Sequence, residues 1–365
     1  MTRRSILHCT MLVIPFMLYM YFAIIFDLIT NVPDHEENGI TGDSFPTLKA
    51  NFSNFERAGS VDFLVNNSTT YYCKEYESKC QNNIKFNCQN IKQIKLLEKI
   101  GHGVTKQAFL GLYKGEEVVV KMVTRHQKEA RECLNELLGS DSSDVVKRSK
   151  CFVFPTMKLM KEILMLHQLK HEGFLRLLGF CARSEESDST DLSEHGVIAV
   201  YERGTILSVG KLKSLSTENK VRQSLHLVSF FQYLATSPLG SLRVRDFKME
   251  HFLMVNSTIK MIDLDDVDNI EPSCDAYSIE SNTQKPPCSY NLKCEMGLCN
   301  GHNAKRNIEK ANELFFTNLL TPDAFPGECF KMLQHIHHSL RELSVNYGDL
   351  QRSLKELLDS VIYLH

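Results

Sequence analysis

The stretch that decides the fold is "RVRDFKMEHFLMVNSTIKMIDLDD", residues 243–266. Asp246 and Asp263 stand at the two ends of a short hairpin pattern, in which "FLMV" and "IKMI" flank the turn residues that begin at Asn256. The two aspartates are 17 positions apart, which is the span of a tight hairpin. They are either turn residues beside a β-hairpin or a pair of catalytic carboxylates that lie together at its open end.

The residues around Asp246 favour the chemical interpretation, because they follow the catalytic loop of protein kinases, H-R-D-x-K-x-x-N. Val244-Arg245-Asp246 takes the H-R-D place, Lys248 the lysine and His251 the asparagine, while Asp263 takes the first place of D-F-G. Phosphoryl transfer needs one carboxylate to accept the proton of the attacking hydroxyl and another to hold the metal that bridges the phosphates. Asp246 is therefore the predicted catalytic base, Asp263 a metal ligand, and Lys248 a contact of the γ-phosphate of ATP.

The other parts of a kinase site precede this stretch in the expected order. Gly101 and Gly103 lie between two predicted strands, where backbone amides can approach phosphates, but Lys106 stands in place of the third glycine of G-x-G-x-x-G. Lys121 ends the β-branched run "EEVVVK", and Glu162 lies on a predicted helix. A kinase uses such a Lys–Glu pair to aim the lysine at the α- and β-phosphates. Taken alone, the two glycines would indicate an ordinary turn, Lys121 a solvated lysine at a strand end, and Glu162 a surface glutamate on an amphipathic helix.

Two departures concern the metal, for which Mg²⁺ or Mn²⁺ is expected. His251 replaces the asparagine that would hold a second Mg²⁺, and imidazole suits Mn²⁺ or Zn²⁺ better than Mg²⁺. Asp265 replaces the glycine of D-F-G and adds a carboxylate. One hypothesis is that His251 and Asp265 rebuild the second site with a preference for Mn²⁺. Alternatively, His251 is a polar loop residue and Asp265 a cap.

The wider pattern predicts an α+β fold with the two lobes of a protein kinase: an N-lobe over residues 91–203 and a C-lobe over residues 204–365. Strands are expected within 92–123, at 173–180 and at 197–202, and helices over 156–170 and 221–235, with a charged, serine-rich loop over 125–150. The formal net charge of −2 over 365 residues gives no footprint for nucleic acid.

Residues 1–30 predict entry into the secretory pathway. The run from Cys9 to Phe26 holds no charge for 18 residues and follows Arg3 and Arg4, which fits a signal anchor or a signal peptide. Residues 31–90 are then a lumenal stem with a cysteine-containing lead-in. A location in the Golgi lumen or outside the cell follows, with membrane attachment unless the first segment is cleaved.

Two further patterns agree with that compartment. The N-glycosylation acceptors are Asn51, Asn66, Asn67 and Asn256. Eleven of the 12 cysteines follow the apolar run, so one is expected to be free or to pair between chains. Four of them (274, 288, 294 and 299) occupy the place of the activation segment; they lack tight zinc spacing, so disulfides are predicted, in a segment that needs no activating phosphate to order it.

The stretches 235–266 and 297–320 resemble the vertebrate lonesome kinase family. Its most particular marks here are Asp263-Leu264-Asp265-Asp266 and the pattern C-x-G-x-N-x-K-R-N from Cys299 to Asn307. The resemblance covers about residues 91–330 and implies ATP-dependent phosphorylation of tyrosine in secreted or lumenal proteins. By the same match Lys121, Glu162, Asp246 and Asp263 keep their kinase roles.

Two other functions fit the residues. A kinase-shaped binding module without activity is consistent with the lost glycine and asparagine, and a kinase for a glycan or small molecule would use the same phosphate machinery. Lys248 is typical of serine/threonine kinases, so tyrosine specificity comes from the resemblance alone.

Overall fold

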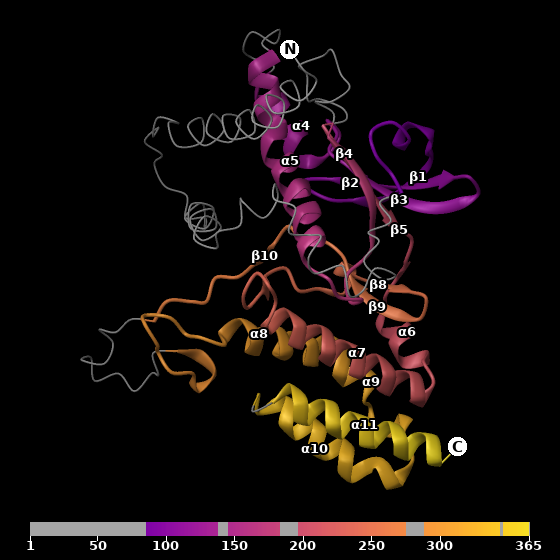
Figure 1. Ribbon diagram of the computed structural model, residues 1–365, viewed down its shortest axis with the longest axis vertical. Helices are drawn as coiled ribbons and strands as arrows, with labels where there is room; N and C mark the ends of the chain where they lie inside the picture. The colour runs from indigo at the N-terminus through magenta and orange to yellow at the C-terminus, as the bar shows by residue number, and fades with distance from the viewer. Residues whose placement is uncertain (1–84, 138–144, 183–195, 275–287, 344–345, 365) are drawn as a thin grey trace, which may run out of the picture. The chain divides into compact units, whose positions relative to one another are not determined.

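A computed structural model describes residues 85–137, 145–182, 196–274, 288–343 and 346–364 of the chain (Figure 1). Its first part is a five-stranded antiparallel sheet of order β1-β2-β3-β5-β4. The strands are β1 Lys95–His102, β2 Gln107–Tyr113, β3 Glu116–Met122, β4 Leu177–Ala182 and β5 Val197–Glu202. The α+β class predicted from the sequence is confirmed.

The β2–β3 hairpin places Lys121 in the middle of this sheet. Lys114 and Gly115 have φ of 50° and 84°, the left-handed pair of a two-residue turn that matches the twist of the flanking strands. Lys121 pairs with Ala108 of β2 and with Ala199 of β5, so strands on both sides fix its backbone. Val118, Val119 and Val120 before it are buried, as expected of a β-branched central strand.

Helix α5, Val145–Gln168, covers one face of the sheet and carries Glu162 (Figure 1). Phe152, Leu159 and Ile163 are fully buried at helical spacing, and they pack with Ala199 and Tyr201 of β5 in the main core. The loop predicted over residues 125–150 is wrong at both ends, because α4 spans Lys128–Glu136 and α5 begins at Val145. The Cys133–Cys151 disulfide joins the two helices, so burial and a cross-link override a loop-like composition.

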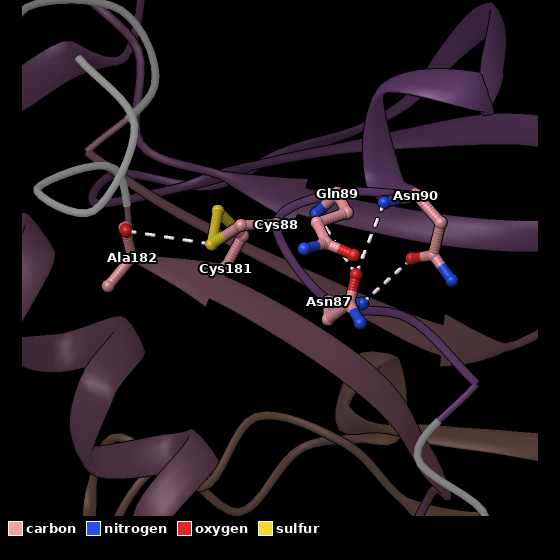
Figure 2. Close-up of a disulfide and its surroundings, with 6 residues drawn as sticks. All are labelled: Asn87, Cys88, Gln89, Asn90, Cys181 and Ala182. Atoms are coloured by element: carbon pink, nitrogen blue, oxygen red, sulfur yellow. Dashed lines mark hydrogen bonds between the residues drawn. A yellow bond between two sulfur atoms is a disulfide. The ribbon is translucent and has the colours of Figure 1, made fainter. Parts of the chain in front are cut away.

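The opposite face of the sheet is covered by the segment that leads into β1. Phe86 is fully buried, forms an isolated parallel bridge with Gly179, and meets the Tyr113 ring edge-on at 4.8 Å between centroids. Cys88 is disulfide-bonded to Cys181 of β4, as Figure 2 shows. Asn87 accepts hydrogen bonds from the backbone N–H groups of residues 89 and 90 and closes the turn beside the disulfide. The lead-in therefore packs against the sheet from residue 85 onward.

Helices dominate the chain after β5. The long ones are α7 Thr217–Ala235, α8 His302–Ala311, α10 Phe330–Arg341 and α11 Tyr347–Tyr363, and α7 packs against α8 and α11 (Figure 1). Helix α7 begins at the Ser216 cap, whose side chain accepts a hydrogen bond from Asn219 N, and it buries Phe230 and Phe231. The shorter elements are β6 Thr205–Ile206, α6 Val209–Ser214, β7 Arg243–Val244, β8 Phe252–Val255, β9 Thr258–Met261, β10 Val267–Asp268 and α9 Thr317–Leu319.

The cysteines of the described residues support the predicted disulfide framework. Cys274 pairs with Cys294 and Cys288 with Cys299, so the zinc alternative for this segment is replaced by two cross-links. Among the cysteines of the described residues, Cys329 is a buried free thiol, whereas Cys73 and Cys80 lie outside those residues.

Several predictions fall on residues that lie outside the described ranges. They are the membrane or signal segment, most of the stem, and the acceptors Asn51, Asn66 and Asn67. Within the described ranges, no helix combines the length and the hydrophobicity that a membrane span requires.

Candidate active site

The β8–β9 hairpin brings Asp246 and Asp263 to the same end of the structure, as the sequence predicts. Residues 249–251 form a short 3₁₀ turn before β8, and Ile262 N donates to His251 O at 2.8 Å, which ties the two ends of the stretch together. Asp263 has a φ of 65°, a left-handed conformation that costs an aspartate of order 1 kcal/mol. Such a conformation persists only where surrounding contacts hold it, and here the carboxylate contacts Lys106 and faces His251.

Lys121 and Glu162 form the expected ion pair. Lys121 Nζ lies 2.7 Å from Glu162 Oε1, and it also lies over the Tyr201 ring at 4.9 Å from the centroid. The side chain of Glu162 is only 1% exposed. Burial opposes its charged form, but the charges of Lys106 and Lys121 outweigh burial and lower the pKa of Glu162. The Glu162 carboxylate is therefore charged, and it is fixed in the interior beside Lys121.

Lys106 belongs to the site, although the sequence presented it only as a missing glycine. Its Nζ lies 2.6 Å from Asp263 Oδ1, 2.7 Å from Glu162 Oε2 and 3.0 Å from Asp265 Oδ2. Burial disfavours the ammonium, but the three carboxylates outweigh it and raise the pKa of Lys106. The structure explains its position, because Lys106 lies two residues before Ala108, which pairs with Lys121 in the sheet. No pattern in the sequence gives this pairing.

Asp265 joins this cluster through Lys106. Besides that ion pair, its backbone oxygen accepts a hydrogen bond from Lys161 Nζ at 2.9 Å. Burial raises the pKa of the Asp265 carboxyl and Asp263 adds to the rise, whereas Lys106 opposes it. For Asp263 itself, the charges of Lys106 and Lys121 outweigh burial and lower the pKa. The two carboxylates thus share one ammonium.

His251 is placed to ligate a metal together with Asp263. Its Nδ1 lies 2.9 Å from the backbone oxygen of Asp246, and because a carbonyl can only accept, Nδ1 carries the hydrogen. In the neutral ring Nε2 then holds the lone pair, and it lies 3.5 Å from Asp263 Oδ2 and 3.6 Å from Asp246 Oδ2. An imidazole and a carboxylate with facing lone pairs fit one divalent ion such as Mn²⁺. These residues therefore fit the metal that the fold implies.

Asp246 and Lys248 form the open part of the site. Lys248 Nζ donates to Asp246 Oδ2 at 2.6 Å, and the two side chains are 47% and 44% exposed. Hydrogen bonding to Asp246 raises the pKa of Lys248. A carboxylate that is accessible from solvent and adjacent to an ammonium can receive an acceptor hydroxyl.

The glycines Gly101 and Gly103 lie where β1 turns into β2. A Cβ on Gly103 would be 2.5 Å from the Lys106 carbonyl oxygen, so only glycine allows the loop to fold this tightly. A Cβ on Gly101 would meet Ala108 Cβ at 3.1 Å. Both positions therefore help to place Lys106 over the carboxylates.

Helix α8 forms hydrogen bonds with the backbone of residues 241–244, which precede Asp246. Asn307 Oδ1 accepts a hydrogen bond from Val244 N, and its Nδ2 donates to Leu242 O at 2.8 Å. Asn303 Nδ2 donates to Ser241 O at 2.9 Å. These buried amides hold the strand that leads into Asp246. The pattern from Cys299 to Asn307 thus has a positioning role, which the sequence alone does not reveal.

Comparison with known proteins connects this geometry to a family. A family model described as the protein-kinase domain of FAM69 matches residues 155–360, which is more than half of the chain. Human "Extracellular tyrosine-protein kinase PKDCC" is 29% identical over 276 residues, which cover 75% of this chain and 53% of that protein.

Two further relatives have kinase names and shorter matches. Chicken "Protein O-mannose kinase" is 26% identical over 162 residues, covering 44% of this chain and 37% of that protein. A probable serine/threonine-protein kinase of Dictyostelium discoideum is 27% identical over 143 residues, covering 39% of this chain and 7% of that protein. The chain thus spans about half, or less, of the length of these curated relatives.

Proposed function

Because the chain belongs to the family defined by the protein-kinase domain of FAM69, and within it resembles the lonesome kinases, we propose that it is a secretory-pathway kinase that phosphorylates tyrosine in extracellular or lumenal proteins. One observation carries the proposal. Lys121, Glu162, Asp246 and Asp263 come from four separate segments and meet in one site, where Lys106 joins Glu162 to Asp263 and His251 lies beside both aspartates. A binding module has no use for this arrangement.

Each residue has a distinct task in the proposed reaction. Lys121, oriented by Glu162, binds the α- and β-phosphates of ATP, and Lys248 steadies the γ-phosphate. Asp263 and His251 hold a divalent metal, which neutralises phosphate charge when bound. The oxygen of the acceptor hydroxyl attacks the γ-phosphorus of ATP, and ADP leaves. Asp246 accepts the proton of that hydroxyl.

The expected location is the Golgi lumen or the cell exterior, reached through residues 1–30 as a signal anchor or signal peptide. Four described disulfides support an oxidising compartment. Asn256 is exposed at the tip of the β8–β9 hairpin, where a glycan would extend into solvent. Peptide mapping that finds Asn256 glycosylated would support this location, and an unmodified Asn256 in protein from a secretory host would argue against it.

A glycan kinase is the second candidate, and the similarity to chicken protein O-mannose kinase favours it. Lys248 is compatible with this candidate, because a lysine at this position is typical of serine/threonine kinases and does not indicate a tyrosine acceptor. The two candidates share the phosphate-binding residues and differ only in the acceptor.

The deciding experiment measures transfer of labelled phosphate from ATP by the full chain, with Mg²⁺ or Mn²⁺. The acceptors are a mixture of secreted proteins and, separately, an O-mannosyl glycopeptide. Lys121→Ala and Asp263→Asn are the test variants, and Lys95→Ala and Asp323→Asn, at exposed positions, are their matched controls.

Label on tyrosine that both test variants abolish and both controls retain would support the tyrosine kinase. Label on the sugar would support the second candidate. If neither metal gives transfer, and ATP does not bind to the folded chain, the kinase proposal is wrong and the binding module is favoured.

A further inference from the structure

The loop lysine Lys106 suggests a departure from ordinary kinase metal use. A kinase site holds two Mg²⁺ ions through the D-F-G aspartate and the catalytic-loop asparagine. We propose that the Lys106 ammonium takes the place of one of these ions, so that this site binds nucleotide phosphates with a single divalent metal. The inference rests on the proposed kinase function and concerns how that function is performed.

The contacts of Lys106 are those of a fixed cation. Its ammonium has three N–H donors and three carboxylate partners, all within 3.0 Å, and its side chain is 7% exposed. Gly103 folds against its carbonyl oxygen, and Gln107 starts the ladder of β2 directly after it. The ammonium is therefore held in place from its backbone to its tip. A metal ion, in contrast, must be recruited from solution.

Asp263 is divided between two neighbours. Its Oδ1 faces Lys106 Nζ at 2.6 Å, and its Oδ2 faces His251 Nε2 at 3.5 Å. A second metal bound through Oδ1 would have to displace the ammonium. The Oδ2 side, with the lone pair of His251, accommodates one ion. The geometry thus provides one position for a metal and one for the lysine.

The charges of the buried groups agree with this division. The buried cluster contains three carboxylates, of Glu162, Asp263 and Asp265, and two ammonium groups, of Lys106 and Lys121. Its net charge is therefore −1. Removal of Lys106 would leave three carboxylates facing one ammonium, an arrangement that favours binding of a further cation. Asp265, which replaces the D-F-G glycine, is thus explained as a partner of the lysine.

The test counts metal ions directly. Mn²⁺ bound to the full chain is measured by electron paramagnetic resonance in the presence of the non-hydrolysable nucleotide AMP-PNP, and bound nucleotide is measured in parallel. The wild-type chain is expected to bind one Mn²⁺ per nucleotide. Two Mn²⁺ per nucleotide in the wild type would overturn the inference, and this count requires no variant.

Variants at position 106 sharpen the count. Lys106→Met is expected to bind a second Mn²⁺ and, at one equivalent of Mn²⁺, to bind AMP-PNP roughly 10- to 100-fold more weakly. Lys106→Arg keeps the cation and should keep one Mn²⁺. Lys95→Met, on exposed β1, is the matched control. Because Lys106→Met leaves buried carboxylates unpaired, the double variant Lys106→Met with Asp265→Asn serves as a better-balanced form.

Two results would count against the inference in different ways. Tighter AMP-PNP binding by the position-106 variants would show that the ammonium obstructs the phosphates, and the inference would be wrong while the kinase proposal stands. No AMP-PNP binding to the folded wild-type chain with either Mg²⁺ or Mn²⁺ would overturn the kinase proposal and the inference together.

Discussion

Two regions of the candidate site contain the same types of side chain in opposite settings. The buried cluster consists of Lys106, Lys121, Glu162, Asp263 and Asp265, whose side chains are between 1% and 23% exposed. The catalytic-loop pair, Asp246 and Lys248, is 44% and 47% exposed. Both regions are built from lysine–carboxylate contacts of 2.6–3.0 Å. Contact distance alone therefore says little about what a pair contributes.

The difference lies in solvent. An exposed ion pair contributes at most about 1 kcal/mol to stability, because water screens it and the side chains lose freedom. Removal of one partner from a buried pair leaves an uncompensated charge and costs about 3–5 kcal/mol. The cluster should thus be essential to both folding and phosphate binding, whereas the pair should be essential to catalysis alone.

The largest effect is expected at the exposed pair, and on activity. Asp246→Asn removes the proton acceptor and should lower kcat roughly 10²- to 10⁴-fold, while the melting temperature stays unchanged. Phosphate transfer and thermal unfolding of the same preparation measure the two quantities. Asp323→Asn, also exposed, should change neither. A large loss of stability in Asp246→Asn would contradict the comparison.

The next effect is on stability, and it is expected in the buried cluster. Glu162→Ala leaves Lys106 and Lys121 without the carboxylate that bridges them, so the free energy of unfolding should fall by about 3–5 kcal/mol. Urea unfolding measures it. Glu132→Ala, at an exposed position of α4, is the control and should stay within about 0.5 kcal/mol of the wild type. Equal effects of the two substitutions would remove the distinction between the regions.

The members of both regions differ in how far the sequence predicts them. Lys121, Glu162, Asp246 and Asp263 each stand in a kinase pattern with defined spacing, and the structure brings them together. The residue types suffice there because the chemistry of phosphoryl transfer restricts them. The same reasoning reached His251, whose ring faces both aspartates.

Lys106 could not be predicted in the same way. A lysine in the place of a glycine reads as a defect in the loop, and its role depends on a tertiary approach of three segments. The helical structure of residues 128–136 and 145–155 was missed for a related reason. Their composition is that of a loop, and the Cys133–Cys151 disulfide and the burial of Phe152 decide the outcome.

A third prediction concerns Asp268, a buried carboxylate that pairs with Arg245 of the catalytic loop. Its side chain is 4% exposed and pairs with Arg245 Nε, and β10 pairs with β7 beside it. We expect this carboxylate to supply Arg245 with the negative charge that an activating phosphate brings in other kinases. Asp268→Asn should lower the free energy of unfolding by about 1.5–3 kcal/mol.

Urea unfolding checks this value, and phosphatase treatment checks the interpretation. Activity of the wild type should survive the phosphatase. Asp349→Asn breaks an Asp–Arg pair whose side chains are 64% and 70% exposed, so it should cost well under about 1 kcal/mol. Loss of activity after phosphatase treatment would mean that Arg245 depends on a phosphate after all.

The smallest effect is expected at His171. Its ring is half-buried, so its exposure to solvent is intermediate between that of the buried cluster and that of the catalytic-loop pair. Its Nδ1 accepts a hydrogen bond from Gly173 N at 2.9 Å, and its Nε2 lies 3.3 Å from Ser229 Oγ. Burial, and then the neighbouring His226, lower the pKa of His171. Protonation of Nδ1 would replace that hydrogen bond with a repulsive contact between two donors.

The sign of the pH effect follows from this lowered pKa. The unfolded imidazole has a pKa of about 6.5, so below that pH the unfolded chain binds more protons and stability falls as pH falls. Between about pH 7.5 and about pH 5.5, the wild type should lose roughly 1–2 °C more in melting temperature than His171→Gln does. His335→Gln, at an exposed position, should behave like the wild type. If His171→Gln shows the same loss as the wild type, a half-buried imidazole in this chain is as well screened as an exposed one.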